Sequence, residues 1–239
     1  MKKKLKYLAF VVLLGFISFL YGFSIHRNRA EKIKNVVVEF DSGDNIFLTH
    51  SMVNKLLIQN NDSIKNQPKS VLDLHRLEQK VLSNPYVEKA AVFVTIDGEL
   101  KTIIKQREPI ARIENKSTSY YIDMYGVKVP LSKNFSARVV LVTGVNTPAE
   151  IKEVTKLVNI ILADDFLKKE IIGIQKLKTN EYVFNVRSGN YKIDFGKFIN
   201  TGVKFKKLKA FYNKALADKT IQNYQTINLK YHNQVVCAK

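Results

Sequence analysis

An uncharged stretch near the start of the chain, Tyr7–Phe23, limits the possible folds more than any other feature. It contains 17 residues without a charged side chain, inside a longer apolar run, Leu5–Ile25. About 20 residues are needed to cross a ~30 Å hydrocarbon core as a helix. The sequence therefore predicts a transmembrane helix over residues 7–25, preceded by a short tail of residues 1–6.

A cleaved signal peptide is the main alternative to a retained anchor. The apolar core of a signal peptide usually has ~7–15 residues, and small residues mark the cleavage site. Phe23–His26 shows no such pattern, so we favour a retained anchor. Basic residues flank both ends of the span. Because so little chain precedes it, the simpler topology keeps the N-terminus in the cytoplasm and the C-terminal region outside.

The composition predicts a folded chain with a basic surface. Hydrophobic residues make up 46% of the sequence and charged residues 25%, which argues against wholesale disorder. The net charge is +18, enough to influence which partners approach. No nucleic-acid motif accompanies this charge. Cys237 is the only cysteine, and the four histidines lie in separate segments, so the sequence predicts neither a disulfide nor a metal site.

The region after the span has the order strand, helix, helix, strand, strand. Ser70 and Asp73 resemble a capping box, and Asp97-Gly98 is typical of a type I′ hairpin turn. This order predicts a compact α+β unit over residues 33–108, with two helices on one face of a small sheet. The expected elements are a strand at Val36–Phe40, a helix capped by Thr49, a helix opened by Ser70 that ends at Ser83–Pro85, and strands at Val87–Ile96 and Leu100–Arg107.

The pattern of residues 109–233 predicts a mixed β-domain with two helices. Residues 234–239 are expected to form a C-terminal tail. The capping residues Thr147 and Glu150 open the first helix, which is expected to reach about Leu167. The second helix is expected to bury Phe205, Leu208, Tyr212 and Leu216 and to expose a basic face. The expected strands are Ile110–Ile113, Tyr120–Asp123, Gly126–Val129, Arg138–Thr143, Ile171–Lys178, Glu181–Arg187, Tyr191–Phe195 and Gln225–Tyr231.

Several short motifs stand in a fixed order along the chain. Leu82–Ala90 joins the second predicted helix to the next strand, and Arg107–Ile113 joins the two regions. In this order, and together with the N-terminal anchor, the motifs resemble the FtsQ/DivIB family of bacterial cell-division proteins over nearly the whole chain. The later motifs are Tyr121-Ile122-Asp123, Gly126-Val127, Val129-Pro130 and Thr143-Gly144.

The resemblance implies that residues 33–108 form a POTRA domain and that residues 109–233 form the β-domain of that family. It also implies a bitopic scaffold without catalysis, which joins the septal ring and links early cytoplasmic components to the later wall-synthesis complex. In that family the last strand of the β-domain and the helix before it bind the small bitopic proteins FtsB and FtsL, and the POTRA domain helps recruitment. We therefore expect similar partners, and a location in the cytoplasmic (inner) membrane at the division septum.

The last predicted strand, Gln225–Tyr231, is the candidate binding site. The final strand of a chain can lie at a sheet edge, where open N–H and C=O groups can accept a strand from a partner. The lysines of the preceding helix would then form a rim that steers an acidic partner. Alternatively, Tyr231 simply closes the core and Lys230 is solvated. The expected partner-binding residues are Thr226, Asn228, Lys230 and Tyr231.

Two other classes of function compete with this scaffold. A catalytic site usually shows paired carboxylates, a Ser/Cys–His arrangement or a Gly-rich phosphate loop. The sequence contains neither a G-x-S-x-G nor a G-x-x-x-x-G-K pattern, and Asp164-Asp165 is expected to be solvated near a helix C-terminus. A module that binds anionic lipid or wall polymer is the alternative, because Lys197–Lys239 contains nine lysines and one acid. We expect no catalytic residue, no cofactor and no metal.

Overall fold

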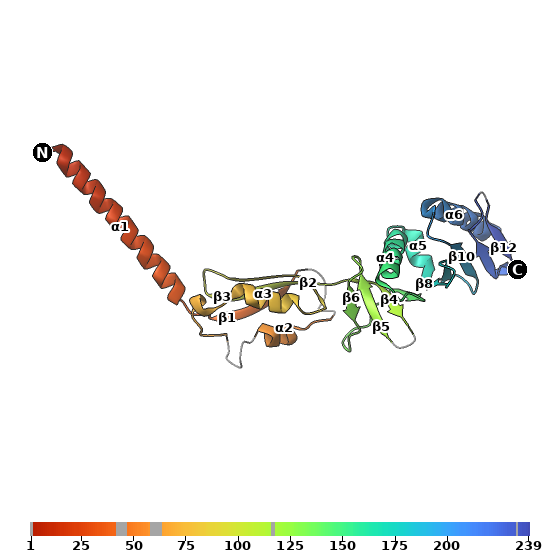
Figure 1. Cartoon of the computed structure of the whole chain (residues 1–239), viewed down its shortest axis with the longest axis horizontal. Helices are drawn as coiled ribbons and strands as arrows, with labels where there is room; N and C mark the ends of the chain where they lie inside the picture. Colours follow the sequence, from red (N-terminus) through yellow and green to blue (C-terminus); the bar gives the residue numbers. More distant parts are fainter. Residues whose placement is uncertain (1, 42–46, 58–63, 116–117, 233) are drawn as a thin grey trace. The chain divides into compact units, whose positions relative to one another are not determined.

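The chain folds into two units, Met1–Gln106 and Arg107–Lys239 (Figure 1). Each unit has a hydrophobic core of its own. The computed structural model describes residues 2–41, 47–57, 64–115, 118–232 and 234–239.

The first helix, α1 (Lys2–Ala30), contains the apolar stretch. Its segment Phe10–Asn28 is long and apolar enough to cross a membrane, and none of it is buried by the rest of the protein. Its large apolar side chains are therefore exposed; Phe19, for example, is 66% exposed. A soluble helix would bury such a surface, and so α1 fits a transmembrane anchor.

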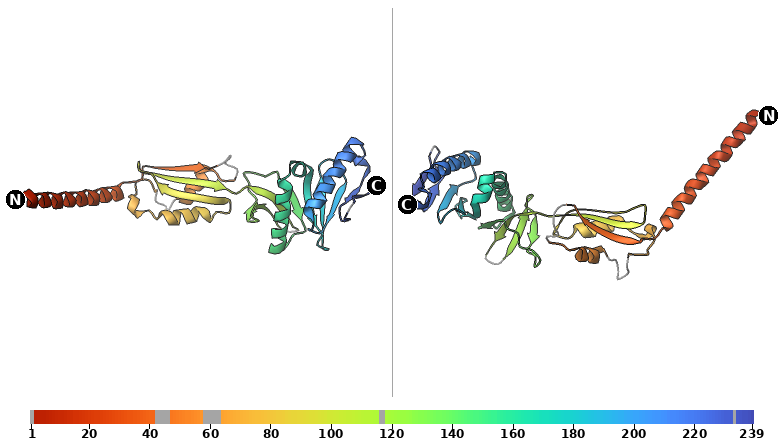
Figure 2. Two further views of the ribbon diagram at one scale, coloured as in Figure 1. Left: turned by 90° about the horizontal axis from the view of Figure 1, so that it is seen from above. Right: turned by 180° about the vertical axis from the view of Figure 1, so that it is seen from behind.

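The first unit continues with a three-stranded sheet in the order β1-β3-β2, in which β1 is parallel and β2 antiparallel to β3. Its two helices cover one face of the sheet (Figure 2) and bury Val53, Leu57, Leu77 and Val81. The predicted strand-helix-helix-strand-strand order is confirmed. The elements are β1 (Asn35–Phe40), α2 (His50–Leu57), the 3₁₀ turn η1 (Lys69–Val71), α3 (Leu74–Leu82), β2 (Val87–Val94) and β3 (Glu99–Gln106).

Two local details of this unit differ from the prediction. The residue that caps α3 is Asp73, whose carboxylate accepts from the backbone N–H of Arg76 over 2.9 Å, whereas Ser70 lies in η1. The hairpin turn is not type I′, because only Gly98 of the Asp97-Gly98 pair has a positive φ, of 85°. The N–H of Gly98 bonds to the carbonyl of Thr95, as in a type I turn followed by a left-handed glycine.

The second unit is built on a nine-stranded sheet in the order β12-β11-β10-β9-β8-β7-β4-β5-β6. β7 is parallel to both β4 and β8, and β10 is parallel to β11, so the sheet is mixed as predicted. The strands are β4 (Pro109–Glu114), β5 (Ser119–Asp123), β6 (Lys128–Pro130), β7 (Val140–Thr143), β8 (Ile171–Lys176), β9 (Tyr182–Val186), β10 (Lys192–Gly196), β11 (Thr226–Asn228) and β12 (Val236–Ala238).

In the described part of this unit three α-helices accompany the sheet, one more than predicted. α4 (Pro148–Leu162) begins with the expected Thr147–Glu150 capping box but ends before Leu167. A separate short helix, α5 (Asp165–Glu170), follows, and Asp164 is its N-cap rather than a solvated residue at a helix end. Asp164 also forms an ion pair with Lys209 at 2.6 Å.

The last helix, α6 (Thr201–Ala217), buries Phe205, Leu208 and Tyr212 as predicted, whereas Leu216 is 51% exposed. All three α-helices lie on one face of the sheet (Figure 2). Ala215, rather than Leu216, continues the buried stripe, because positions 208, 212 and 215 keep the helical period.

A buried hydroxyl cluster ties α5 and α6 to the sheet. Oε1 of Glu170 accepts hydrogen bonds from the hydroxyls of Ser188 (2.5 Å) and Tyr212 (2.9 Å). The hydroxyl of Tyr191 donates to that of Tyr212 over 2.7 Å. Burial raises the pKa of Tyr212 and of Tyr191 above the usual value for tyrosine. The cluster therefore satisfies a buried carboxylate with neutral donors.

Candidate functional site

The predicted C-terminal strand does not lie at the edge of the sheet. β11 pairs with β10 on one side and with β12 on the other. The open edge expected for Gln225–Tyr231 is therefore wrong, because residues inside the predicted tail, 234–239, fold back as β12 and cover it. β11 is also shorter than predicted, since it ends at Asn228.

Among the described strands, β12 is the outermost on this side, and its outer edge pairs with no other strand. The carbonyl of Ala238 accepts from the N–H of Gln225 over 2.8 Å, so Ala238 faces β11. Main-chain groups alternate in direction along an antiparallel strand, which directs those of Cys237 outward. The free edge is therefore centred on Cys237.

The four predicted residues lie close together, although not on that edge. Thr226 and Asn228 are partly buried in β11, on either side of Ile227, which is fully buried in the core. Lys230 and Tyr231 follow the strand and are exposed, and Tyr231 is 50% exposed. The alternative in which Tyr231 closes the core is therefore wrong.

Lys230 is exposed, but its ammonium group is paired with two carboxylates. Its Nζ lies 2.9 Å from Oε2 of Glu181 and 2.9 Å from Oδ2 of Asp194. Hydrogen bonds to Asp194 and Glu181 raise the pKa of Lys230, and the bond to Lys230 lowers the pKa of Glu181. Asn228 orders the same turn, because its Oδ1 accepts from the N–H of Lys230 over 2.9 Å. Lys230 thus fixes the chain that leaves β11.

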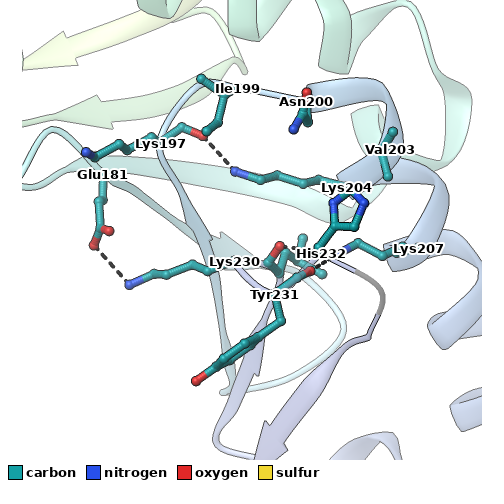
Figure 3. Close-up of a pocket in the computed structure, with 11 residues that line it drawn as sticks. Glu181, Lys197, Ile199, Asn200, Val203, Lys204, Lys207, Lys230, Tyr231 and His232 are labelled. Carbon is teal, nitrogen blue, oxygen red and sulfur yellow. Dashed lines mark hydrogen bonds and ion pairs between the residues drawn. The ribbon is translucent and has the colours of Figure 1, made fainter.

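A shallow groove lies beside this turn (Figure 3). Its volume is about 230 Å³, and its walls come from the β10–α6 connection, the first turns of α6 and the segment after β11. Lys230 and Tyr231 line it, and in Figure 3 the Tyr231 ring points away from the lysines. The other residues that line it are Glu181, Lys197, Ile199, Asn200, Val203, Lys204, Lys207, Leu229 and His232.

Two lysines of the predicted rim hold this wall together. Lys204 is buried, and its Nζ donates to the carbonyls of Phe195 (2.8 Å) and Lys197 (2.7 Å). Burial lowers the pKa of Lys204. Lys207 donates to the carbonyl of Tyr231. These ammonium groups join α6 to the chain on both sides of it, so they do not form a solvated rim.

Sequence reasoning missed β12 and the Lys197–Asn200 wall of the groove. Val235 and Val236 are a β-branched pair that signals a strand, but the run is too short to show its pairing. Val203 and Ile199 are 51% and 60% exposed, so the groove has an apolar wall that no helical period predicted. Only the fold brings this wall beside Tyr231.

The comparisons with known proteins point to one family. The model for the family "FtsQ/DivIB, C-terminal related" matches residues 108–238, more than half of the chain. The chain belongs to this family. A second family model, for a POTRA-like domain, matches residues 31–105. The family is one of non-catalytic cell-division scaffold proteins, and the N-terminal apolar helix fits its membrane anchor.

One solved structure among the matches is the major extracytoplasmic domain of the trans isomer of the bacterial cell-division protein DivIB from Geobacillus stearothermophilus. It is 14% identical to this chain, with a TM-score of 0.32, and the match covers 49% of this chain and 98% of that one. No curated protein matches the sequence. The predicted family and fold class, with a POTRA-like unit followed by a mixed β-domain, are confirmed.

Proposed function

We propose that this FtsQ/DivIB family protein is a bitopic, non-catalytic scaffold that recruits and links division proteins at the septum. Its N-terminus lies in the cytoplasm, α1 spans the cytoplasmic membrane, and both units are extracytoplasmic. Its partners are small single-span division proteins that resemble FtsB and FtsL, together with other divisome components. The observation that supports this proposal best is the outer edge of β12, which pairs with no other strand that the structure describes. The chain segment that leads from β11 toward β12 lines the groove with Lys230 and Tyr231.

The partner adds an extended segment to β12, so that main-chain hydrogen bonds supply affinity and side chains set the register. Tyr231 and Lys230 contact it from the groove. Thr226 and Asn228 contact it only through their side chains, because β10 and β12 occupy both edges of β11. This placement keeps the four predicted residues as partner contacts while moving the main-chain site to β12.

The edge is tested by a pair of variants at Cys237. Cys237→Pro removes an outward N–H, whereas Cys237→Val keeps it and preserves the partial packing of this side chain against the core. Full-length protein is captured from membranes, and the co-purified small single-span proteins are quantified. We expect loss of these partners with Cys237→Pro and retention with Cys237→Val. Equal capture by the two folded variants would place the interface elsewhere.

The topology has a separate test. A reporter that is active only in the cytoplasm should be active when fused at the N-terminus and silent when fused after Lys239. The opposite pattern would overturn both the orientation and the extracytoplasmic scaffold.

Binding of anionic lipid or wall polymer through the basic C-terminal region is the alternative. Four of its lysines already have internal partners: Lys204, Lys207, Lys209 and Lys230. Steep loss of binding with salt would favour an anionic polymer, and salt-tolerant capture of small proteins favours the scaffold.

A further inference from the structure

The turn between β2 and β3 presents an unpartnered apolar side chain. Ile96 is 92% exposed, which makes it the most exposed of the large apolar side chains that the structure describes. It lies between Thr95 and Asp97, in a turn closed by the bond from Gly98 N–H to the Thr95 carbonyl. A single exposed apolar side chain is common on protein surfaces, so its meaning depends on what lies next to it.

Hydrogen bonds hold this turn against the chain that follows α1. The N–H of Lys34 donates to the carbonyl of Gly98 over 2.9 Å. Nζ of Lys69 lies 2.6 Å from Oε2 of Glu31 and 3.4 Å from the carbonyl of Ile96. The N–H of Lys69 also donates to the carbonyl of Glu31 over 2.8 Å. The turn is thus fixed to the residues that directly follow the anchor helix.

The connection between the anchor and this unit is short. The apolar segment of α1 ends at Asn28, and Ile33 is already fully buried in the core of the first unit. Even a fully extended chain from Asn28 to Ile33 spans at most roughly 18 Å. The headgroup layer on each side of a bilayer is about 5–8 Å thick. The turn that is bonded to Lys34 therefore stays close to the membrane surface.

We propose that the β2–β3 turn is a second membrane contact, in which Ile96 enters the interface of the bilayer that α1 spans. Val71 is 66% exposed in the 3₁₀ turn that begins with Lys69, whose Nζ bonds to the Ile96 carbonyl, and it joins this contact. The contact restricts rotation of the first unit against the membrane.

The contact is apolar rather than electrostatic, because basic and acidic side chains are mixed around the turn. It needs no acidic lipid and does not weaken with salt, unlike attraction to a polybasic segment. The charged residues around it are Lys32, Lys34, Lys69, Glu31, Asp97 and Glu99.

This inference rests on the membrane anchoring proposed above, and the test separates the two. Single spin labels are placed at Phe16, Ile96 and Ser83 of the full-length chain carrying Cys237→Ser, in phosphatidylcholine vesicles. Phe16 lies within the apolar segment of α1, whereas Ser83 is exposed after α3, away from the turn. Each label is scored by its collision rate with oxygen, which concentrates in the bilayer, relative to a water-soluble nickel complex.

We expect the highest oxygen-to-nickel ratio at Phe16, a raised ratio at Ile96 that salt does not change, and a low ratio at Ser83. A low ratio at Phe16 would overturn the anchoring itself. A high ratio at Phe16 with equal ratios at Ile96 and Ser83 would overturn the membrane contact of the turn and leave the anchor intact.

A second measurement keeps Ile96 native. A label at Val71 should show a raised ratio, and Ile96→Asp should lower it to the level of Ser83. Ile96 lies outside the core, so this substitution leaves the unit folded. An unchanged ratio at Val71 in the Ile96→Asp protein would count against the contact.

Discussion

Nη1 of Arg107 donates to Oδ2 of Asp123 over 2.7 Å, and this ion pair joins two of the motifs by which the sequence resembles its family. The Asp123 side chain is 4% exposed, and its Oδ1 accepts from the N–H groups of Tyr125 and Val127. One carboxylate therefore fixes both the start of the second unit and the turn after β5.

Replacing Asp123 by Ala should destabilise the second unit strongly. The change leaves the largely buried Arg107 guanidinium without its counter-charge and removes the acceptor of two hydrogen bonds in the turn. We therefore expect the free energy of unfolding to fall by about 3 kcal/mol. Arg107→Met, which leaves Asp123 bonded to the turn, should cost less. Urea unfolding of the full-length protein, followed by near-ultraviolet circular dichroism, measures both. An equal loss for the two variants would contradict this account of the pair.

Replacing Gly144 by Ala should lower the stability of the second unit by more than the addition of one methyl group usually does. Gly144 has a φ of 80°, and an added Cβ would lie 2.1 Å from the carbonyl oxygen of Lys176. The connection between β7 and α4 would have to move away from β8, which we expect to cost more than about 2 kcal/mol. Gly202→Ala in α6 is the matched control, because among the described residues no heavy atom beyond its chain neighbours and the local helix backbone lies within 4 Å of its Cβ position. Similar thermal midpoints for the two variants would contradict the close approach.

The capping box of α4 should make stability depend on acid pH. The carboxylate of Glu150 accepts a hydrogen bond from Lys176 and others from the N–H groups of Asn146 and Thr147. These bonds, that with Lys176 most, lower the pKa of Glu150 from its usual 4.5 to about 2. Because the folded-state pKa is the lower one, the stabilisation is complete above about pH 4.5 and is lost as the pH falls toward 2.

Glu150→Gln should therefore lower stability at pH 7 by roughly 0.5–2 kcal/mol and flatten its decline between pH 4.5 and 2. Urea midpoints measured across this range give the comparison, with the exposed Glu108→Gln as the control. If the stability of Glu150→Gln declined with falling pH as steeply as that of the wild type, another group would control the acid sensitivity.

Replacing Tyr212 by Phe should weaken the packing of α6. The change removes one donor to the buried Glu170 carboxylate and the acceptor for the Tyr191 hydroxyl, at an expected cost of about 1–3 kcal/mol. Tyr125→Phe, at a ring that is 65% exposed, should be nearly neutral in the same urea titration. An unchanged free energy of unfolding in Tyr212→Phe would mean that water replaces the lost hydroxyl.

Local signals in the sequence predicted much of the fold, because they act over a few residues. The Thr147–Glu150 capping box and the turn glycine at position 98 are examples. Signals that depend on distant pairing failed. The sequence could not show that β12 folds back on β11. It also predicted Lys204 as part of a solvated rim, whereas the fold buries this side chain and bonds it to the carbonyls of Phe195 and Lys197.

Position-specific photo-crosslinking in dividing cells tests the central claim most directly. A photoreactive residue replaces Val236, which is 39% exposed in β12, in the full-length protein. Exposed Lys152 is the control position, because it lies on α4, which contacts β4, and β4 is far from β12 in the strand order. The scaffold account predicts crosslinked products with small single-span division proteins from position 236 and none from position 152. Products from position 152 alone, or none from either position while the protein is at the septum, would contradict it.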